Sequence, residues 1–236
     1  MDRPPLIVPT LCAGPFILRP WRLADLAVVR EAAADPYIPL VTTVPAASAG
    51  YDDAAGRAFV ERQWARAADG TGYSFAVALR PDDRAVGFVG LFPQADGRAS
   101  IGYWTAPSAR GRAVAGHALR TVAAWALDDL GLARLELSIE PWNAASLRTA
   151  ERTGFRHEGL LRSHRTIGDE RRDMHLYALL PTDAREATSD PREAPDPREA
   201  PDPREASDPR EAPDPREAAP DPREAAPDPR EDRSQR

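Results

Sequence analysis

The clearest pattern in the chain is a helical repeat of apolar residues between positions 119 and 130. Six apolar residues recur there at intervals of three and four: Leu119, Val122, Ala123, Ala126, Leu127 and Leu130. Polar residues, including His117, Arg120, Thr121 and Asp128, occupy the other side of the same repeat. This spacing predicts an amphipathic helix with one buried face. Gly131 can end that helix in the left-handed conformation.

Alternation of apolar with polar or small residues predicts strands on both sides of this helix. The segments 73–79, 86–92 and 99–105 precede it and are separated by turn residues. Three such segments in succession predict an antiparallel meander. After the helix, residues 135–139 alternate in the same way and predict a half-buried strand.

The C-terminal part of this region is predicted from turn and cap signals. A short helix is expected from about residue 145 to Gly154, because glycine commonly ends helices. Residues 155–167 and 171–180 then predict a hairpin closed by Gly168 and Asp169.

The N-terminal part contributes one strand and two helices. Residues 16–19 predict the strand, residues 23–33 a first helix and residues 52–69 a second, while residues 36–51 predict a loop. In chain order the elements are β-α-α-β-β-β-α-β-α-β-β. This order predicts the α/β (α+β) class, a mixed sheet with helices on its faces.

Composition divides the chain into two parts. From Asp190 onward it repeats Asp-Pro-Arg-Glu-Ala-Pro with small variations and contains no aromatic residue, Leu, Ile or Val. Such a segment cannot bury enough apolar surface to offset the entropy of ordering. We therefore expect one folded domain over residues 12–181 and a disordered repeat tail over residues 182–236.

Charge and cysteine content narrow the classes of partner. The net charge of −6 equals the charge carried by residues 187–236, so residues 1–186 sum to zero and do not favour nucleic acid. Cys12 is the single cysteine, which excludes an intramolecular disulfide. The sequence has no long apolar segment and no signal-peptide pattern at its start. We expect a cytoplasmic protein that binds neither nucleic acid nor membrane.

The turn before the main helix is the first candidate site. It is rich in glycine and alanine and consists of Arg110, Gly111, Arg112, Ala113, Val114, Ala115 and Gly116. Backbone amides at a helix N-terminus attract anions, and the helix dipole adds roughly half a positive charge. A pyrophosphate fits such a turn, with Arg110 and Arg112 adding charge. An ordinary strand-to-helix loop is the alternative.

The second candidate site follows the strand at 135–139. Asn143 and Ser146 stand at the start of the short helix, where their usual role is capping. Glu151, Gly154 and Phe155 follow at the end of the same helix.

Together these segments resemble the GNAT superfamily of N-acetyltransferases. The turn resembles the family's Gln/Arg-x-x-Gly-x-Gly/Ala pattern, with Ala113 in place of the middle glycine. Asn143, Ser146, Glu151, Gly154 and Phe155 match Asn-x-x-Ser followed by Glu-x-x-Gly-Phe. Residues 101–104 and 173–179 also match, and the combination is most similar to the Rim-type branch, which acetylates protein N-termini.

The resemblance implies a mostly antiparallel GNAT-like sheet and acetyl-CoA as co-substrate, without a metal. The strands ending near Thr105 and Ile139 would splay apart around the pantetheine arm. Backbone groups of Tyr103, Trp104 and Thr105 would form hydrogen bonds with that arm. Asn143 would bond to the arm or order a water molecule.

The resemblance also implies catalytic roles. Ser146 would assist the leaving thiolate, and Tyr177 is a second candidate acid, with packing in the sheet as its alternative role. Some Rim-type members carry a carboxylate base in the strand after the Asn-x-x-Ser helix, but residues 162–165 contain no acid. Glu140, Glu158 and His164 are the candidate substitutes.

Ala113 raises a question of backbone geometry. If this position needs a positive φ, alanine costs on the order of 1 kcal/mol. If it is helical, alanine is favourable.

The acceptor is predicted from amine chemistry. At pH 7 an α-amine with a pKa of about 7.8 is about one part in seven neutral, against about one part in 2,500 for a lysine amine. A site without a strong base therefore favours a protein or peptide N-terminus. A small amine such as an aminoglycoside or polyamine, near Asp52, Asp53 and Glu61, is one alternative, and a catalytically silent acyl-CoA-binding module is another.

Overall fold

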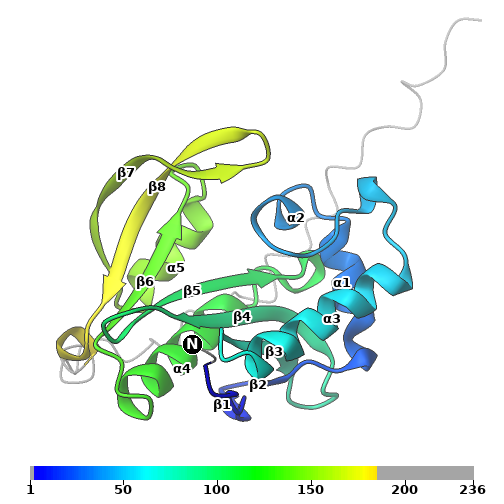
Figure 1. The fold of residues 1–236 in the computed structure, drawn as a ribbon, viewed down its shortest axis with the longest axis horizontal. Coiled ribbons are helices and arrows are strands. Elements are labelled where there is room, and N and C mark those ends of the chain that lie inside the picture. Colours follow the sequence, from blue (N-terminus) through cyan, green and yellow to red (C-terminus); the bar gives the residue numbers. More distant parts are fainter. Residues whose placement is uncertain (1–2, 185–236) are drawn as a thin grey trace, which may run out of the picture. The chain divides into compact units, whose positions relative to one another are not determined.

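The computed structural model describes residues 3–184, so the predicted repeat tail from residue 185 onward lies outside the described residues. Eight strands form a single sheet in the order β1-β2-β3-β4-β5-β6-β8-β7 (Figure 1). The strands are β1 (Leu11–Ala13), β2 (Phe16–Pro20), β3 (Tyr73–Leu79), β4 (Ala85–Pro93), β5 (Arg98–Thr105), β6 (Arg134–Ile139), β7 (Arg156–Ile167) and β8 (Glu170–Leu179).

Five α-helices connect these strands. They are α1 (Leu26–Ala33), α2 (Ile38–Val41), α3 (Asp53–Ala68), α4 (Val114–Asp128) and α5 (Ala144–Arg152). Short 3-10 turns precede α1, α3 and α4. Asp52 caps the N-terminus of α3, because its carboxylate accepts a hydrogen bond from the amide of Ala55 at 2.7 Å. Gly131 adopts a φ of 64° just beyond α4, the conformation expected at this helix end.

The predicted class and element order are confirmed, with two additions. The predicted loop at 36–51 contains α2 and a 3-10 turn. The other addition is β1, whose three residues pair with β2 and are too few for an alternating pattern to be recognised. Residues before β1 also pack onto the fold: the amide of Leu6 donates to the carbonyl of Ala67 at 2.8 Å.

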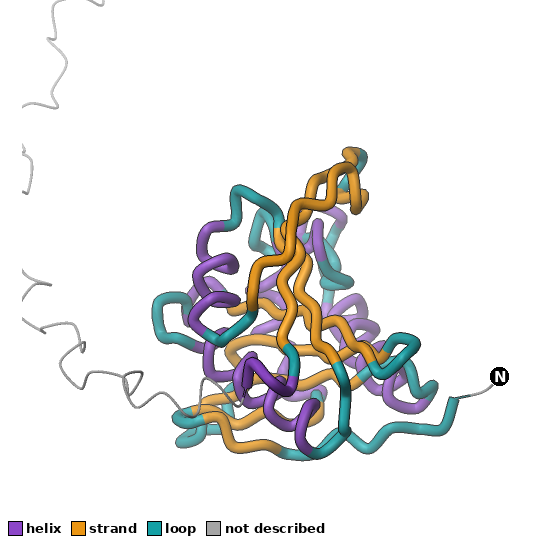
Figure 2. Tube along the Cα trace, turned by 90° about the vertical axis from the view of Figure 1, so that its left-hand side faces the viewer, coloured by secondary structure: helices purple, strands orange, loops and turns teal. Residues whose placement is uncertain are grey.

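Helices lie on both sides of the strands (Figure 2). Each face of the sheet has its own apolar core. On one face, α4 supplies Leu119 and Val122, and α5 supplies Ala150. On the other face, α1 and α3 pack around Trp21 and Phe59, whose rings meet edge to face at 5.2 Å. No helix within the described range is long and apolar enough to cross a membrane.

All neighbouring strands pair antiparallel except β5 and β6. These two run parallel and pair at three positions only, where Arg98, Ala99 and Ser100 face residues 134–136. Beyond Ser100 each strand keeps its partner on the far side, with β4 along β5 and β8 along β6. The sheet therefore opens between β5 and β6, as expected from the resemblance.

Candidate functional site

A cavity of about 620 Å³ lies where β5 and β6 diverge. Its lining includes Ile101 and Tyr103 of β5 and Leu137 and Ile139 of β6. These four residues pack with the α4 side of the sheet. The same cavity is lined by residues of α2, α3 and β7 on the opposite face. The opening in the sheet thus joins the two faces of the molecule.

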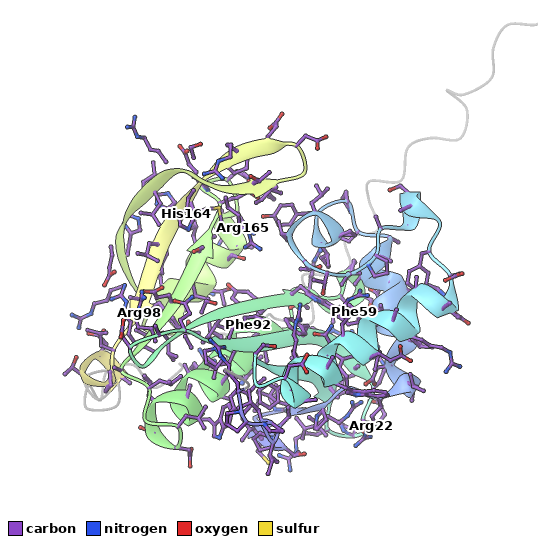
Figure 3. All side chains as sticks on the ribbon, viewed as in Figure 1. Arg22, Phe59, Phe92, Arg98, His164 and Arg165 are labelled. Atoms are coloured by element: carbon purple, nitrogen blue, oxygen red, sulfur yellow. The ribbon has the colours of Figure 1, made fainter. Side chains whose placement is uncertain are left out.

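Side chains from distant segments meet around this cavity. Figure 3 shows His164 and Arg165 on the side of the β7–β8 hairpin, with Phe59 and Phe92 across from them on the side of α3 and the sheet. All four line the cavity, and so does Arg66 of α3.

The turn before α4 has the geometry of an anion site. Gly111 and Ala113 adopt φ of 78° and 54°, and residues 110–113 are exposed. The first helical hydrogen bond runs from the amide of His117 to the carbonyl of Ala113, at 3.1 Å. The amides of residues 111–116 have no acceptor within residues 3–184. Free amides at a helix N-terminus fit a diphosphate.

The structure shows which backbone conformation position 113 adopts. It is the N-cap residue of α4 and lies in the left-handed region. Alanine is therefore strained here, by about 1–2 kcal/mol relative to the right-handed region. Its amide remains available for a ligand.

Arg110 has a partner that the sequence did not indicate. Its Nη2 contacts Asp35 Oδ2 at 2.5 Å, and the Asp35 side chain is buried. Burial would raise the pKa of Asp35, but the amides of Ile38 and Tyr37 together with Arg110 lower it. Arg110 thus ties the turn to the segment that leads into α2. Arg112 is exposed and has no carboxylate partner among the described residues.

Asn143 and Ser146 stand at the start of α5, beside the opening. Asn143 Oδ1 accepts the amide of Ser146 at 3.1 Å, so Asn143 caps the helix. The hydroxyl of Tyr103 donates to the Ser146 carbonyl at 3.4 Å and bridges from β5 to α5. Burial raises the pKa of Tyr103, so this hydroxyl remains a donor at neutral pH. The Ser146 side chain also lies within hydrogen-bonding reach of the Tyr103 hydroxyl.

Glu140 is the buried acid of the cavity. It is 3% exposed and directly follows β6. The hydroxyl of Tyr37 donates to Glu140 Oε2 at 2.5 Å, and Arg172 Nε lies 3.9 Å from Oε1. Burial raises the pKa of Tyr37 and the hydrogen bond to Glu140 raises it further, while Asn143 and Arg165 oppose the change. Tyr37 therefore stays protonated and orients the carboxylate.

Tyr37 is the site residue that sequence reasoning missed. It lies 103 positions from Glu140 in a segment predicted to be a loop. No local pattern could have identified it.

Other candidate residues lie away from the cavity. The Tyr177 hydroxyl donates to Glu151 Oε1 at 3.0 Å, and Tyr177 does not line the cavity, which favours its packing role. Glu158 is exposed and paired with Arg134. The acids considered for a cationic acceptor, Asp52, Asp53 and Glu61, are likewise absent from the cavity lining. Within residues 3–184 no three metal-binding side chains cluster suitably for a metal ion.

Comparison with known proteins agrees with this geometry. A family model described as an acetyltransferase (GNAT) domain matches residues 16–156. This chain belongs to that family. Over 114 residues it is 33% identical to the Bacillus subtilis protein named "Probable N-acetyltransferase YjcK", a match that covers 47% of this chain and 63% of YjcK. The match thus spans less than two thirds of that relative.

Solved structures share the fold. Mycobacterium smegmatis RimJ, solved in complex with a CoA disulfide, superposes with a TM-score of 0.65 at 26% identity, covering 79% of this chain and 96% of RimJ. A chimera of Vibrio cholerae spermidine N-acetyltransferase SpeG with hSSAT superposes with a TM-score of 0.59 at 17% identity. The match covers 72% of this chain and 98% of the chimera. The second likeness concerns the fold alone. The GNAT fold therefore does not by itself identify the acceptor.

We expect Ala113→Gly to raise the free energy of unfolding by about 0.5–1 kcal/mol. Relief of left-handed strain outweighs the greater unfolded-state entropy of glycine, about 0.4–1 kcal/mol. Urea unfolding measures the change, and calorimetry with CoA should show equal or tighter binding. In the matched control Ala124→Gly, on the exposed face of α4, glycine should cost about 1 kcal/mol. Destabilisation by both substitutions would contradict the strain argument.

Proposed function

We propose that this protein is an acetyl-CoA-dependent N-acetyltransferase whose acceptor is the N-terminal α-amine of a protein or peptide. The observation that carries the proposal is the opening between β5 and β6. One cavity there is lined by Tyr103 and Ser146 and by Glu140, whose carboxylate is buried. A donor and an acceptor can therefore approach from opposite faces of the sheet.

The residues of the α4 side fit coenzyme A. The unpaired amides of residues 111–116 and the charge of Arg112 would hold its diphosphate. Backbone groups of Tyr103, Trp104 and Thr105 lie on the edge of β5 that β6 leaves unpaired, and they would hold the pantetheine arm. The bound cofactor would supply an acetyl thioester, an activated acyl group.

Glu140 is suited to receive the proton of the attacking amine. It is the acid among the described residues that line the cavity, and Tyr37 fixes the orientation of its carboxylate. Ser146 Oγ, which lies beside the Tyr103 hydroxyl, would donate to the departing sulfur. Asn143 also lines the cavity, and its side-chain amide NH₂ would orient the arm or a water molecule.

The acceptor assignment rests on charge and on amine chemistry. A polyamine or aminoglycoside carries several positive charges and favours clustered carboxylates, whereas Glu140 shares the cavity with Arg66 and Arg165. An α-amine needs less assistance, since about one part in seven is already neutral at pH 7. A silent acyl-CoA-binding module would not need a buried carboxylate beside the opening.

We expect acetyl transfer to a free peptide N-terminus to exceed transfer to a lysine in the same peptide by about 100-fold in kcat/KM at pH 7, because far more of the α-amine is neutral. Thiol release with a peptide and its N-blocked lysine isomer measures the ratio. Preference for the lysine isomer, or for spermidine or an aminoglycoside, would overturn the acceptor assignment. Binding of acetyl-CoA without turnover on any amine would favour the silent module.

Glu140→Gln should lower kcat/KM for the peptide by about 100-fold, since the variant keeps the shape but cannot accept a proton. Thermal unfolding checks that the domain remains folded. Glu158→Gln is the matched control, because Glu158 is exposed and paired outside the cavity. Equal losses in the two variants would argue against Glu140 as the base.

Substitutions can distinguish a catalytic role of Asn143 and Ser146 from their role in the helix cap. Ser146→Ala keeps the cap, which uses the Ser146 amide, and should slow turnover about tenfold without lowering stability. Asn143→Ser retains a capping oxygen but lacks the side-chain amide NH₂ group. It should slow turnover about tenfold as well, and wild-type rates in both variants would restrict these residues to the helix cap.

A further inference from the structure

Two arginines in the cavity lack an acidic partner. Arg66 of α3 and Arg165 of β7 both line the cavity, and neither forms an ion pair with any carboxylate in residues 3–184. By contrast, Arg110 is paired with Asp35 and Arg172 with Glu170. The arginines among the described residues that line the cavity therefore both lack a carboxylate partner.

Arg66 is partly withdrawn from water. Its Nη1 donates to Gln63 Oε1 at 2.6 Å, its Nη2 contacts Thr43 Oγ1 at 3.5 Å, and its guanidinium lies 5.4 Å from the centre of the Phe92 ring. Burial lowers the pKa of Arg66, and the like charge of Arg62 adds to this. A desolvated cation held by neutral groups gains strongly from a bound anion.

Arg165 reaches the same region from the other side of the cavity. Its Nη2 meets the carbonyl of Val41 at 3.5 Å, two residues from the Thr43 that Arg66 contacts. Arg165 also lowers the pKa of Tyr37, so its charge acts close to the hydroxyl that holds Glu140. The cavity thus has a carboxylate at one point and two free cations along the adjoining segment 41–43.

We propose that the acceptor carries a carboxylate within its first three residues, and that Arg66 and Arg165 bind it while the α-amine lies at Glu140. This rests on the proposed acetyltransferase function. Three extended residues span at most about 10 Å, which matches a cavity of this size. A guanidinium presents several N–H donors in a fork that suits a carboxylate. A lysine or arginine at the same acceptor position meets two like charges.

The test compares three peptides with a free N-terminus and an amidated C-terminus: Ser-Asp-Glu-Phe, Ser-Asn-Gln-Phe and Ser-Lys-Lys-Phe. The wild-type protein should acetylate the acidic peptide with a kcat/KM about tenfold above the neutral one, and the basic peptide should be slowest. The preference should weaken as salt rises from about 50 mM to about 500 mM. Free serine and Ser-Asn with a free C-terminus show whether a main-chain carboxylate serves equally well.

Two variants examine the arginines directly. Arg165→Gln and Arg66→Gln should each reduce the ratio of acidic to neutral peptide, and the double variant should bring it to about one. Arg62→Gln is the matched control, because Arg62 donates to the Thr43 carbonyl at 2.7 Å but does not line the cavity. Arg62→Gln should retain the full preference. Because the Arg165 side chain is exposed, we expect Arg165→Gln to fold normally even if Arg66→Gln proves unstable.

Equilibrium binding separates this inference from the proposed function. With CoA present and no acetyl group, calorimetry should show the acidic peptide binding about tenfold more tightly to the wild type than to Arg165→Gln. If no peptide is acetylated but this difference appears, the transferase proposal fails and the anion site stands. If peptides are acetylated without regard to charge, or if the double variant keeps the preference, the anion site is overturned.

Discussion

The separation of β5 from β6 is the constraint on which the rest of the site depends. Hydrogen bonding between them stops after Ser100, yet β4 and β8 continue to hold the outer edge of each strand. The fold therefore leaves two unpaired backbone edges facing one another in the middle of a sheet. Such edges are costly unless a partner fills the space, and the extended arm of a cofactor can supply that partner without disturbing either core.

The end of α1 supports both sides of this opening. The Asp35 carboxylate caps the amides that begin α2 and also holds Arg110 of the turn. Glu31 accepts the amide and hydroxyl of Ser108 in the 3-10 turn before α4. The turn before α4 and the segment that leads into α2 and lines the cavity thus share one anchor. Glu31 and Asp35, at the end of α1, thus fix the turn before α4 relative to the segment that leads into α2.

Charge is distributed unevenly along the cavity. Glu140 is buried and held by Tyr37, whereas Arg66 and Arg165 retain unused donors beside the segment 41–43. This asymmetry gives the cavity a direction, with a buried carboxylate at one point and two guanidinium groups beside the segment 41–43. The net charge of zero over residues 1–186 conceals this arrangement, because opposite charges cancel in the sum.

The sequence alone determined those features that depend on neighbouring residues. Periodicity located α4 and the strands β3 to β5, and turn chemistry indicated Gly131 and the cap at Asn143, because such signals act within a few residues. The tertiary structure decided the remainder. Tyr37 meets Glu140, and Arg110 meets Asp35, only after the strands have paired. The left-handed φ of Ala113 likewise follows from how the turn enters α4, since alanine itself favours the opposite conformation.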